Sequence, residues 1–342
     1  MKTSDFDYQL PPELIAQTPI EPRDCSRLMV LNRREGTIEH RQFREILDYV
    51  KSGDLMVFNN SRVIPARIIG QKQNSKTKVE ILLLRRLEAN SWETLVRPGR
   101  KLELGTRITI GALPPISGEE VTAEVIERRE GGLRTIRLSN DSLIEKYGRI
   151  PLPPYIHTPL ENSERYQTIY SEPKGSVAAP TAGLHFTSEL LDELREKGVQ
   201  TAFITLHIGL DTFQPVRVDN PKRHVIHNEY GQLDSEVADT VNRTKMGGKK
   251  IIAVGTSTVR LLEAAAQTDT IQPIRGWVNL FILPGYRFRV TDVMVTNFHL
   301  PKSTLLMLVA AFAGKDFILR AYEQAKERNY RFYSFGDAMI IL

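Results

Sequence analysis

The feature that most constrains the fold is a change in hydrophobic pattern near residue 151. Before it, six short apolar runs rich in β-branched residues are separated by turn residues, at 63–69, 79–84, 92–96, 107–110, 121–126 and 133–138. Short strands at this spacing are typical of a small antiparallel barrel or sandwich. A short helix is predicted at 141–148, where glycine ends it.

After residue 151, helical and strand patterns alternate. Helices are predicted between Thr187 and Gly198 and at 235–246, 257–266, 302–313 and 316–328, and strands at 201–208, 250–254, 277–283 and within 331–342. This alternation indicates an α/β domain. The first 60 residues have no core pattern of their own and contribute an apolar strand at 54–58. The predicted fold class is therefore α/β plus all-β. A discontinuous α/β domain is built from both chain ends, 1–62 and 151–342, and a small antiparallel β-barrel domain is inserted at 63–150.

Several classes of protein are excluded by composition. The longest uncharged apolar run, 305–313, has nine residues, whereas a membrane-spanning helix needs about 20. The N-terminal segment is acidic and lacks the apolar stretch of a secretory signal. Cys25 is the only cysteine, so an intrachain disulfide or a cysteine-based metal site is impossible. We expect a cytoplasmic monomer without a membrane partner.

Positive charge is concentrated in the predicted barrel. The net charge of the chain is +5, yet eleven basic and only four acidic residues fall between Arg62 and Thr109. Clustered positive charge attracts polyanions, and nucleic acid first among them. The alternative is an ordinary solvated strand surface.

Two histidines lie where α/β domains place their ligands. His185 sits in a segment rich in Gly, Pro and hydroxyl residues, 180–187, that leads into a helix, and His207 ends an apolar strand. A histidine with a pKa near 6.5 suits proton transfer. The alternatives are a packed ring for His185 and a simple strand-end turn for His207.

A hydroxyl-rich turn joins a predicted strand to a helix at 253–260. Thr256, Ser257 and Thr258 stand at the helix start, where they either cap the helix or help its N-terminus to hold a carboxylate or phosphate. The segment matches neither the dinucleotide-binding glycine pattern nor the P-loop.

The histidine spacing does not favour a metal site. His185, His207 and His299 show no local ligand spacing, and the pair His224 and His227 is weak support for a metal. His299 is predicted to be structural. We therefore predict no metal ligands.

Two loops carry arginines that suit anion binding. Arg23 and Arg27 lie in the segment 22–27, and Arg62 ends the segment 59–62. Arginines bind carboxylate or phosphate bidentately. The alternative for each is a turn or a surface ion pair.

Together these motifs resemble the S-adenosylmethionine:tRNA ribosyltransferase-isomerases, a family of queuosine biosynthesis. The resemblance extends from 5–8 to 333–339 through long motifs in order, at 21–24, 57–67, 148–156, 178–187, 284–288 and 297–306. Two departures are small. Asp211 stands where the family pattern has glycine, and the hydroxyl residues at 256–258 are permuted.

The resemblance implies a specific reaction. The family transfers and isomerises the ribosyl part of S-adenosylmethionine onto the 7-aminomethyl-7-deazaguanine wobble base of tRNA, which yields epoxyqueuosine-tRNA, adenine and methionine. S-adenosylmethionine is then a ribosyl-donating co-substrate, and no cofactor is expected. The family fold, a β-barrel domain with an α/β domain, agrees with the hydrophobic pattern. A non-catalytic tRNA-binding module and a metal-dependent hydrolase are the alternatives.

The implied reaction assigns roles to the candidate residues. A base must remove the ribose C5′ proton beside the sulfonium, an acid must protonate the leaving adenine, and the attacking amine must be neutral. The proton-transfer candidates are His185, His207, Asp24 and Asp337. The substrate-binding candidates are Arg23, Arg27, Asn60, Arg62, Thr181, Gly183, Thr256, Ser257, Thr258, Tyr286, Phe288, Asn297 and Tyr333. Among these, the hydroxyls at 256–258 suit the methionine carboxylate, the arginines suit carboxylate or RNA phosphate, and the aromatic rings suit stacking on adenine or a flipped base.

Overall fold

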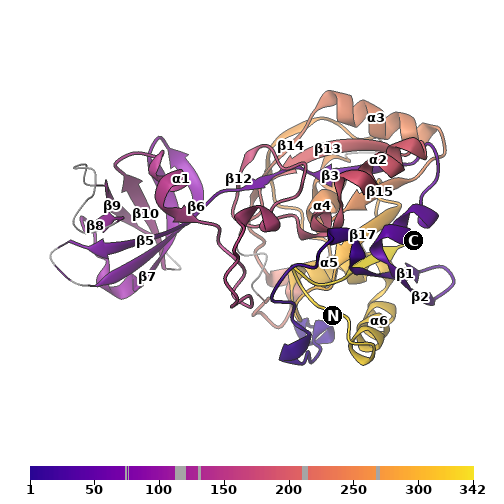
Figure 1. Ribbon diagram of the computed structural model, residues 1–342, viewed down its shortest axis with the longest axis horizontal. Helices are drawn as coiled ribbons and strands as arrows, with labels where there is room; N and C mark the ends of the chain where they lie inside the picture. The colour runs from indigo at the N-terminus through magenta and orange to yellow at the C-terminus, as the bar shows by residue number, and fades with distance from the viewer. Residues whose placement is uncertain (74, 76, 112–120, 130–131, 210–214, 267–269) are drawn as a thin grey trace. The chain divides into compact units, whose positions relative to one another are not determined.

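The chain folds into two compact units. The computed structural model describes residues 1–342 except 74, 76, 112–120, 130–131, 210–214 and 267–269 (Figure 1). The larger unit comprises Met1–Arg62, Pro153–Pro173 and Ala179–Leu342, and the smaller comprises Val63–Leu152 and Lys174–Ala178. Both chain ends therefore belong to the larger unit. Asp211 lies outside the described residues.

The smaller unit is a closed antiparallel barrel. Its strands follow one another in the order β5 (Arg67–Lys72), β6 (Lys78–Glu88), β7 (Ser91–Arg97), β10 (Leu133–Leu138), β9 (Val121–Arg128) and β8 (Arg107–Ile110). β8 pairs back onto β5, which closes the barrel. Alternate residues of β6, Val79, Ile81 and Leu83, are buried because successive side chains of a strand point to opposite faces.

Short elements complete the connections of the barrel. They are β4 (Arg62–Val63), α1 (Leu143–Tyr147), β11 (Gly148–Arg149) and β12 (Lys174–Ser176). β11 pairs with β5.

The larger unit is built on a nine-stranded mixed sheet. The strand order is β16 (Ile274–Val278), β14 (Glu229–Leu233), β13 (Gln200–Leu206), β3 (Leu55–Asn59), β15 (Ile251–Val254), β17 (Val293–Asn297), β18 (Ala338–Ile341), β1 (Arg27–Asn32) and β2 (Thr37–Gln42). The central strands β13, β3, β15 and β17 are parallel, and β18 runs antiparallel to β17. The carboxyl ends of the four parallel strands therefore meet at one edge, together with the starts of β18 and β1.

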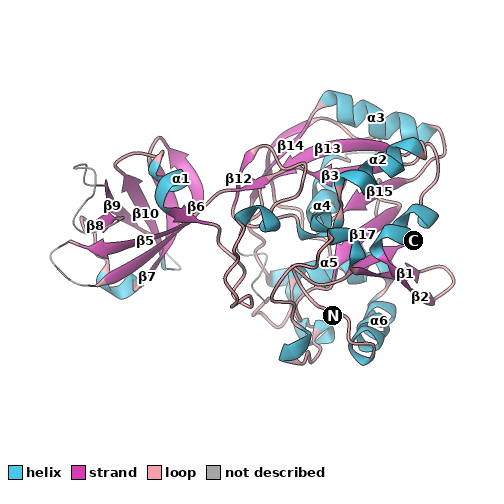
Figure 2. Ribbon diagram, viewed as in Figure 1, coloured by secondary structure: helices cyan, strands magenta, loops and turns pink. Residues whose placement is uncertain are grey.

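Helices cover both faces of this sheet (Figure 2). One core contains residues of α3 (Ser235–Met246), α4 (Thr256–Ala265), α5 (Thr304–Ala313) and α6 (Lys315–Glu327), and the other contains residues of α2 (Ser188–Glu196) and the 3₁₀ helix η4 (Phe43–Tyr49). In β3, Leu55 and Val57 enter the first core, whereas Met56 and Phe58 enter the second. A sheet buried on both faces explains the continuous apolar runs of its central strands. The predicted fold class is confirmed.

Four strands of the nine-stranded sheet differ from the sequence-based prediction. The strand expected at 277–283 is β16, which lies at 274–278, and β2, β14 and β17 were not predicted. β2 is an edge strand whose side chains are half-buried or exposed, and β14 alternates buried positions with Tyr230 and Gln232. Such strands carry a weak hydrophobic signal, because their stability comes from pairing with a neighbour. Within the described ranges, no helix is both long and apolar enough to cross a bilayer.

Candidate active site

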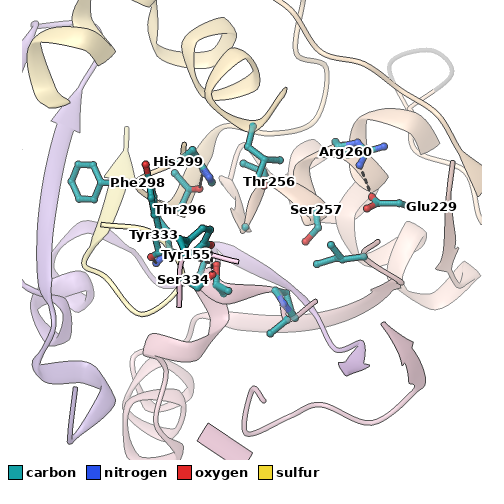
Figure 3. Close-up of a pocket in the computed structure, with 18 residues that line it drawn as sticks. Tyr155, Glu229, Thr256, Ser257, Arg260, Thr296, Phe298, His299, Tyr333 and Ser334 are labelled. Carbon is teal, nitrogen blue, oxygen red and sulfur yellow. Dashed lines mark hydrogen bonds and ion pairs between the residues drawn. The ribbon is translucent and has the colours of Figure 1, made fainter. Parts of the chain in front are cut away.

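A pocket opens where the parallel strands of the larger unit end (Figure 3). Its walls come from the start of β14, the residue after β15, the end of β17, the start of α4, and the segments 179–182 and 333–334. The space between these walls amounts to about 600 Å³, including space open to solvent. Open α/β sheets bind ligands at this edge.

The start of α4 forms one wall of the pocket. Gly255 joins β15 to α4 with a φ of 94°, a left-handed conformation that favours glycine. Thr256, Ser257 and Arg260 lie on one helical face, three and four positions apart, and all three line the pocket. Thr258 is fully buried and donates to the carbonyl oxygen of Val254 at 2.7 Å. Of the three predicted hydroxyl residues, two therefore reach the pocket.

A buried ion pair lies beside this helix start. Arg260 Nη1 donates to Glu229 Oε2, and both side chains are buried. Arg260 Nε also donates to the carbonyl oxygen of Leu280 at 3.2 Å, and Glu229 Oε1 accepts from the N–H of Gly209 at 3.1 Å. Sequence reasoning missed both charged residues. The available signal was an arginine one helical turn beyond Thr256, on a helix whose only other charged residue is Glu263.

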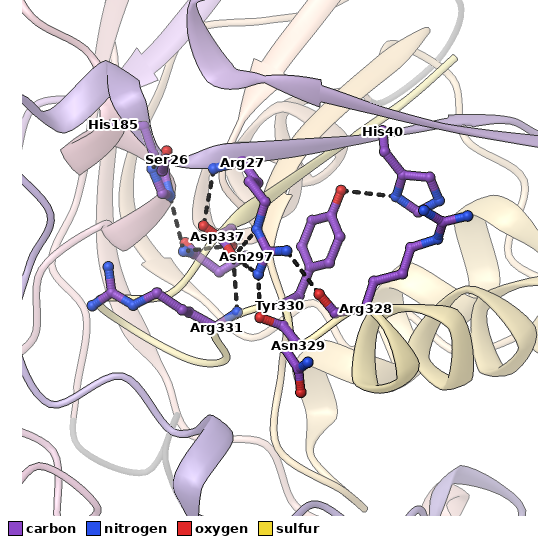
Figure 4. Close-up of polar contacts among 10 residues, drawn as sticks. All are labelled: Ser26, Arg27, His40, His185, Asn297, Arg328, Asn329, Tyr330, Arg331 and Asp337. Carbon is purple, nitrogen blue, oxygen red and sulfur yellow. Dashed lines mark hydrogen bonds and ion pairs between the residues drawn. The ribbon is translucent and has the colours of Figure 1, made fainter.

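Asn297, at the end of β17, links the pocket wall to the buried His185. Thr181 Oγ1 donates to Asn297 Oδ1 at 3.0 Å, and Asn297 Nδ2 donates to His185 Nε2 at 3.1 Å. Since Nε2 is an acceptor, Nδ1 carries the proton and donates to Ser26 Oγ at 2.7 Å. Figure 4 shows His185 with its two partners, Asn297 and Ser26. Thr181 and Asn297 line the pocket, whereas His185 lies behind them.

Burial controls the protonation of the two histidines near the pocket. Together with the charges of Arg331 and Arg23, it lowers the pKa of His185 to about 3. His299 lines the pocket, with its Nε2 atom hydrogen-bonded to Thr296 Oγ1 at 2.7 Å, and burial lowers its pKa to about 3. Both rings are therefore neutral at neutral pH.

His207 lies at the end of β13 beside Ile208, which lines the pocket. Its Nδ1 is 2.6 Å from Ser61 Oγ, and partial burial lowers its pKa. The ring is half-buried and stacks on Tyr230. It is therefore more accessible to a bound substrate than His185 is.

An asparagine that was not among the predicted site residues connects strands β3 and β13 to helix α4. Asn59, at the end of β3, donates to the carbonyl oxygen of Leu206 at 2.9 Å and to Ser257 Oγ at 3.1 Å. The predicted neighbour, Asn60, accepts instead from Thr205 Oγ1 at 2.8 Å. An amide at the end of a fully buried strand was the signal for Asn59.

Asp337 and Arg27 bind each other outside the pocket lining (Figure 4). The buried Asp337 carboxylate accepts from the backbone N–H groups of Arg27 at 2.9 Å and of Arg331 at 2.8 Å, and from Arg27 Nε at 3.2 Å. The Arg27 guanidinium also donates to the carbonyl oxygens of Arg328 and Asn329. These contacts hold the segment that follows α6.

Three other charged candidates, all outside the pocket lining, also have protein partners. Arg23 donates to the carbonyl oxygens of Gln167 at 2.7 Å and Glu164 at 3.0 Å. Arg62 pairs with the Glu164 carboxylate and donates to Ser171 Oγ at 2.9 Å. Asp24 is buried with its carboxylate 3.9 Å from Arg44.

Gly183 has a packing role. A Cβ atom at this position would lie 2.1 Å from the hydroxyl oxygen of Tyr170. Only glycine therefore allows Tyr170 to pack here without displacement, and Gly183 is not part of the pocket lining.

The aromatic candidates separate into two groups. Tyr333 lines the pocket with Tyr155, and their ring centroids are 4.7 Å apart. Tyr286 instead donates to Glu263 at 3.4 Å in the last turn of α4, and Phe288 packs on Phe312. Tyr286 and Phe288 thus lie toward the far end of α4 from the pocket-lining residues.

Fold and site together define a class of protein. The α/β unit has a pocket at its strand edge, and a helix N-terminus, a buried arginine and an aromatic pair line this pocket. Together with the inserted barrel, this arrangement is typical of an enzyme that binds a small anionic substrate. The family model described as queuosine biosynthesis protein matches residues 3–341. The chain belongs to this family, that of the S-adenosylmethionine:tRNA ribosyltransferase-isomerases, as the sequence motifs predicted.

Similar proteins match over their whole length. The S-adenosylmethionine:tRNA ribosyltransferase-isomerase of Dehalococcoides mccartyi (strain CBDB1) is 55% identical, and that of Symbiobacterium thermophilum is 51% identical, each with 100% of both chains covered. The crystal structure of S-adenosylmethionine tRNA ribosyltransferase from Thermotoga maritima is 44% identical, with a TM-score of 0.58, over 99% of this chain and 100% of that chain. The prediction of a transferase is confirmed, in preference to a tRNA-binding module or a hydrolase.

Proposed function

We propose that this enzyme transfers and isomerises the ribosyl moiety of S-adenosylmethionine onto the 7-aminomethyl-7-deazaguanine wobble base of tRNA. The products are epoxyqueuosine-tRNA, adenine and methionine. The observation that carries this proposal is the match to ribosyltransferase-isomerases along the whole chain. We place the activity in the cytoplasm with its tRNA substrate, and we expect a monomer that needs no resident cofactor.

Two parts of the pocket wall suit the two halves of the donor, its methionine and its adenosine. Thr256 and Ser257 present hydroxyls at the start of α4, where unpaired N–H groups and the helix dipole favour the methionine carboxylate. Tyr155 and Tyr333 lie at another part of the wall, where their rings suit stacking on adenine (Figure 3). We infer that the donor lies along the pocket between these two groups.

Proton transfer is the main chemical task of the site. The C5′ proton beside the sulfonium must leave, adenine must gain a proton, and the attacking amine must lose one. His207 is our first candidate for one of these transfers, because its ring is half-buried and its neighbour Ile208 lines the pocket. His185 acts as a positioning residue for Asn297, since both of its ring nitrogens are hydrogen-bonded.

The barrel is our candidate for tRNA phosphate contacts. Its basic residues include Lys78, Arg97, Arg100 and Arg107, all of which are exposed. Lysine and arginine neutralise phosphates and release counterions, so this binding should depend on salt.

Turnover with defined RNA tests the proposal. The protein is incubated with S-adenosylmethionine and tRNA that carries the aminomethyl-deazaguanine base, and adenine, methionine and RNA mass are measured. We expect release of both small products and a pentose-derived mass gain in the RNA. The same tRNA with guanine at the wobble position is the control. Methyl transfer, or an unchanged mass with the competent RNA, contradicts the assignment.

A further inference from the structure

One buried charge in the pocket has a donor group without an acceptor. Arg260 is 6% exposed, and its Nη1 and Nε bind Glu229 and the Leu280 carbonyl oxygen. Its Nη2 has no hydrogen-bond partner within the described part of the chain. A buried N–H left unpaired costs free energy, so the arrangement favours a ligand that brings an acceptor.

The position of Arg260 identifies where that acceptor would bind. Arg260 follows Ser257 by three residues and Thr256 by four, so all three side chains share one face of α4 and line the same pocket. In Figure 3, Arg260 and Ser257 lie on the same side of the pocket, with Glu229 beyond the guanidinium. A planar carboxylate can accept from an arginine N–H with one oxygen and from a hydroxyl or helix N–H with the other.

We propose that Arg260 is the residue that selects the donor by its α-carboxylate, through Nη2, and that Glu229 is the positioning residue that orients the guanidinium. This inference rests on the proposed function. It names the chemical group of S-adenosylmethionine that the residues at the start of α4 recognise. Glu229 balances the charge of Arg260 in the buried ion pair. It also occupies Nη1, which leaves Nη2 for the ligand.

Selectivity follows from the same geometry. A donor without the carboxylate leaves the Nη2 proton unpaired in a buried site, and no other group of that donor compensates. Sites with a polar group that only the correct substrate satisfies reject the analogue strongly. The enzyme should therefore discriminate against decarboxylated S-adenosylmethionine, which keeps the sulfonium, ribose and adenine.

The test compares adenine release from S-adenosylmethionine and from its decarboxylated analogue. We expect the unmodified protein to prefer the intact donor in kcat/KM by about 10–100-fold, the range of a charge-assisted hydrogen bond. Arg260→Gln should reduce this preference to about threefold or less, mainly through a higher KM for the intact donor. Arg260→Lys, which keeps the charge but removes the planar fork, should fall between the two.

Three further variants separate a positioning role of Glu229 from a general loss of structure. Glu229→Gln should raise KM for the intact donor and leave kcat unchanged, and Glu229→Asp should restore part of the affinity. Arg289→Gln is the matched control, because Arg289 donates to the Ala266 carbonyl oxygen at the far end of α4. It should keep the preference of the unmodified protein.

The outcomes distinguish this inference from the proposed function. Equal use of both donors by the unmodified protein overturns the inference and leaves the ribosyl transfer intact, and this comparison needs no variant to fold. A preference that survives in folded Arg260→Gln also overturns the inference alone. Release of adenine from neither donor overturns both.

Discussion

The amide group of Asn297 donates to Nε2 of His185 across 3.1 Å, which joins two residues that lie 112 positions apart. Asn297 also accepts from Thr181 on the pocket wall. His185 is thereby connected to the pocket through a neighbouring side chain, and its low pKa keeps it neutral. This relationship separates the two histidines that the sequence had grouped as proton-transfer candidates.

Acid should destabilise the protein through its buried histidines. An unfolded histidine takes up a proton near pH 6.5, whereas burial lowers the pKa of folded His185 and His299 to about 3. Stability is therefore complete above about pH 6.5 and falls as the pH decreases toward 3, by roughly 1.4 kcal/mol per pH unit for each ring. His185→Gln should flatten the pH dependence of the unfolding free energy by that amount, measured with urea. The exposed His157→Gln should leave it unchanged, and an unaltered slope in His185→Gln contradicts the prediction.

Replacing His207 should slow the chemistry without unfolding the protein. Loss of a general acid or base typically lowers the rate by about 10²–10⁴-fold. We expect His207→Gln to keep its melting temperature and donor affinity while single-turnover adenine release falls by at least about a hundredfold. His157→Gln again provides the control. If both His207→Gln and His185→Gln turn over at the parent rate, Asp24 or Asp337 becomes the candidate for proton transfer.

Salt dependence should locate the RNA surface on the barrel. Removing one side chain that binds a phosphate should lower the slope of log affinity against log salt concentration by about one unit. We expect this for Lys78→Ala, because Lys78 is exposed. Arg86 pairs with Asp141 at 2.6 Å, so Arg86→Ala should have a smaller effect. Arg195→Ala on α2 is the control, and equal slopes in all three variants place the RNA elsewhere.

Chelation should leave turnover intact. The chain has one cysteine, and no group of three or more potential ligands comes together in the part of the chain that the structure describes. The ring nitrogens of His185 are already hydrogen-bonded to Ser26 and Asn297. Activity is measured before and after EDTA treatment and gel filtration. A loss that zinc or manganese restores contradicts this prediction.

Local patterns in the sequence were sufficient for the fold class. The spacing of apolar and turn residues predicted the barrel strands, and the period of 235–246 predicted the bounds of α3. Local patterns also predicted that Thr256 and Ser257 lie at the sheet edge, since a helix start after a buried strand places its first residues there. These features depend on neighbours a few positions away, and the periods of helix and strand record them directly.

Long-range pairing decided which polar groups remain for a ligand. Arg27 was a candidate for anion binding, but its guanidinium binds Asp337, 310 positions away. Arg260 was not among the candidates, yet Glu229 binds its guanidinium, and one of its nitrogens, Nη2, has no partner among the described residues. A charged side chain is available to a substrate only when the folded protein has not satisfied it, and that balance of burial and hydrogen bonding exists only once distant segments are packed together.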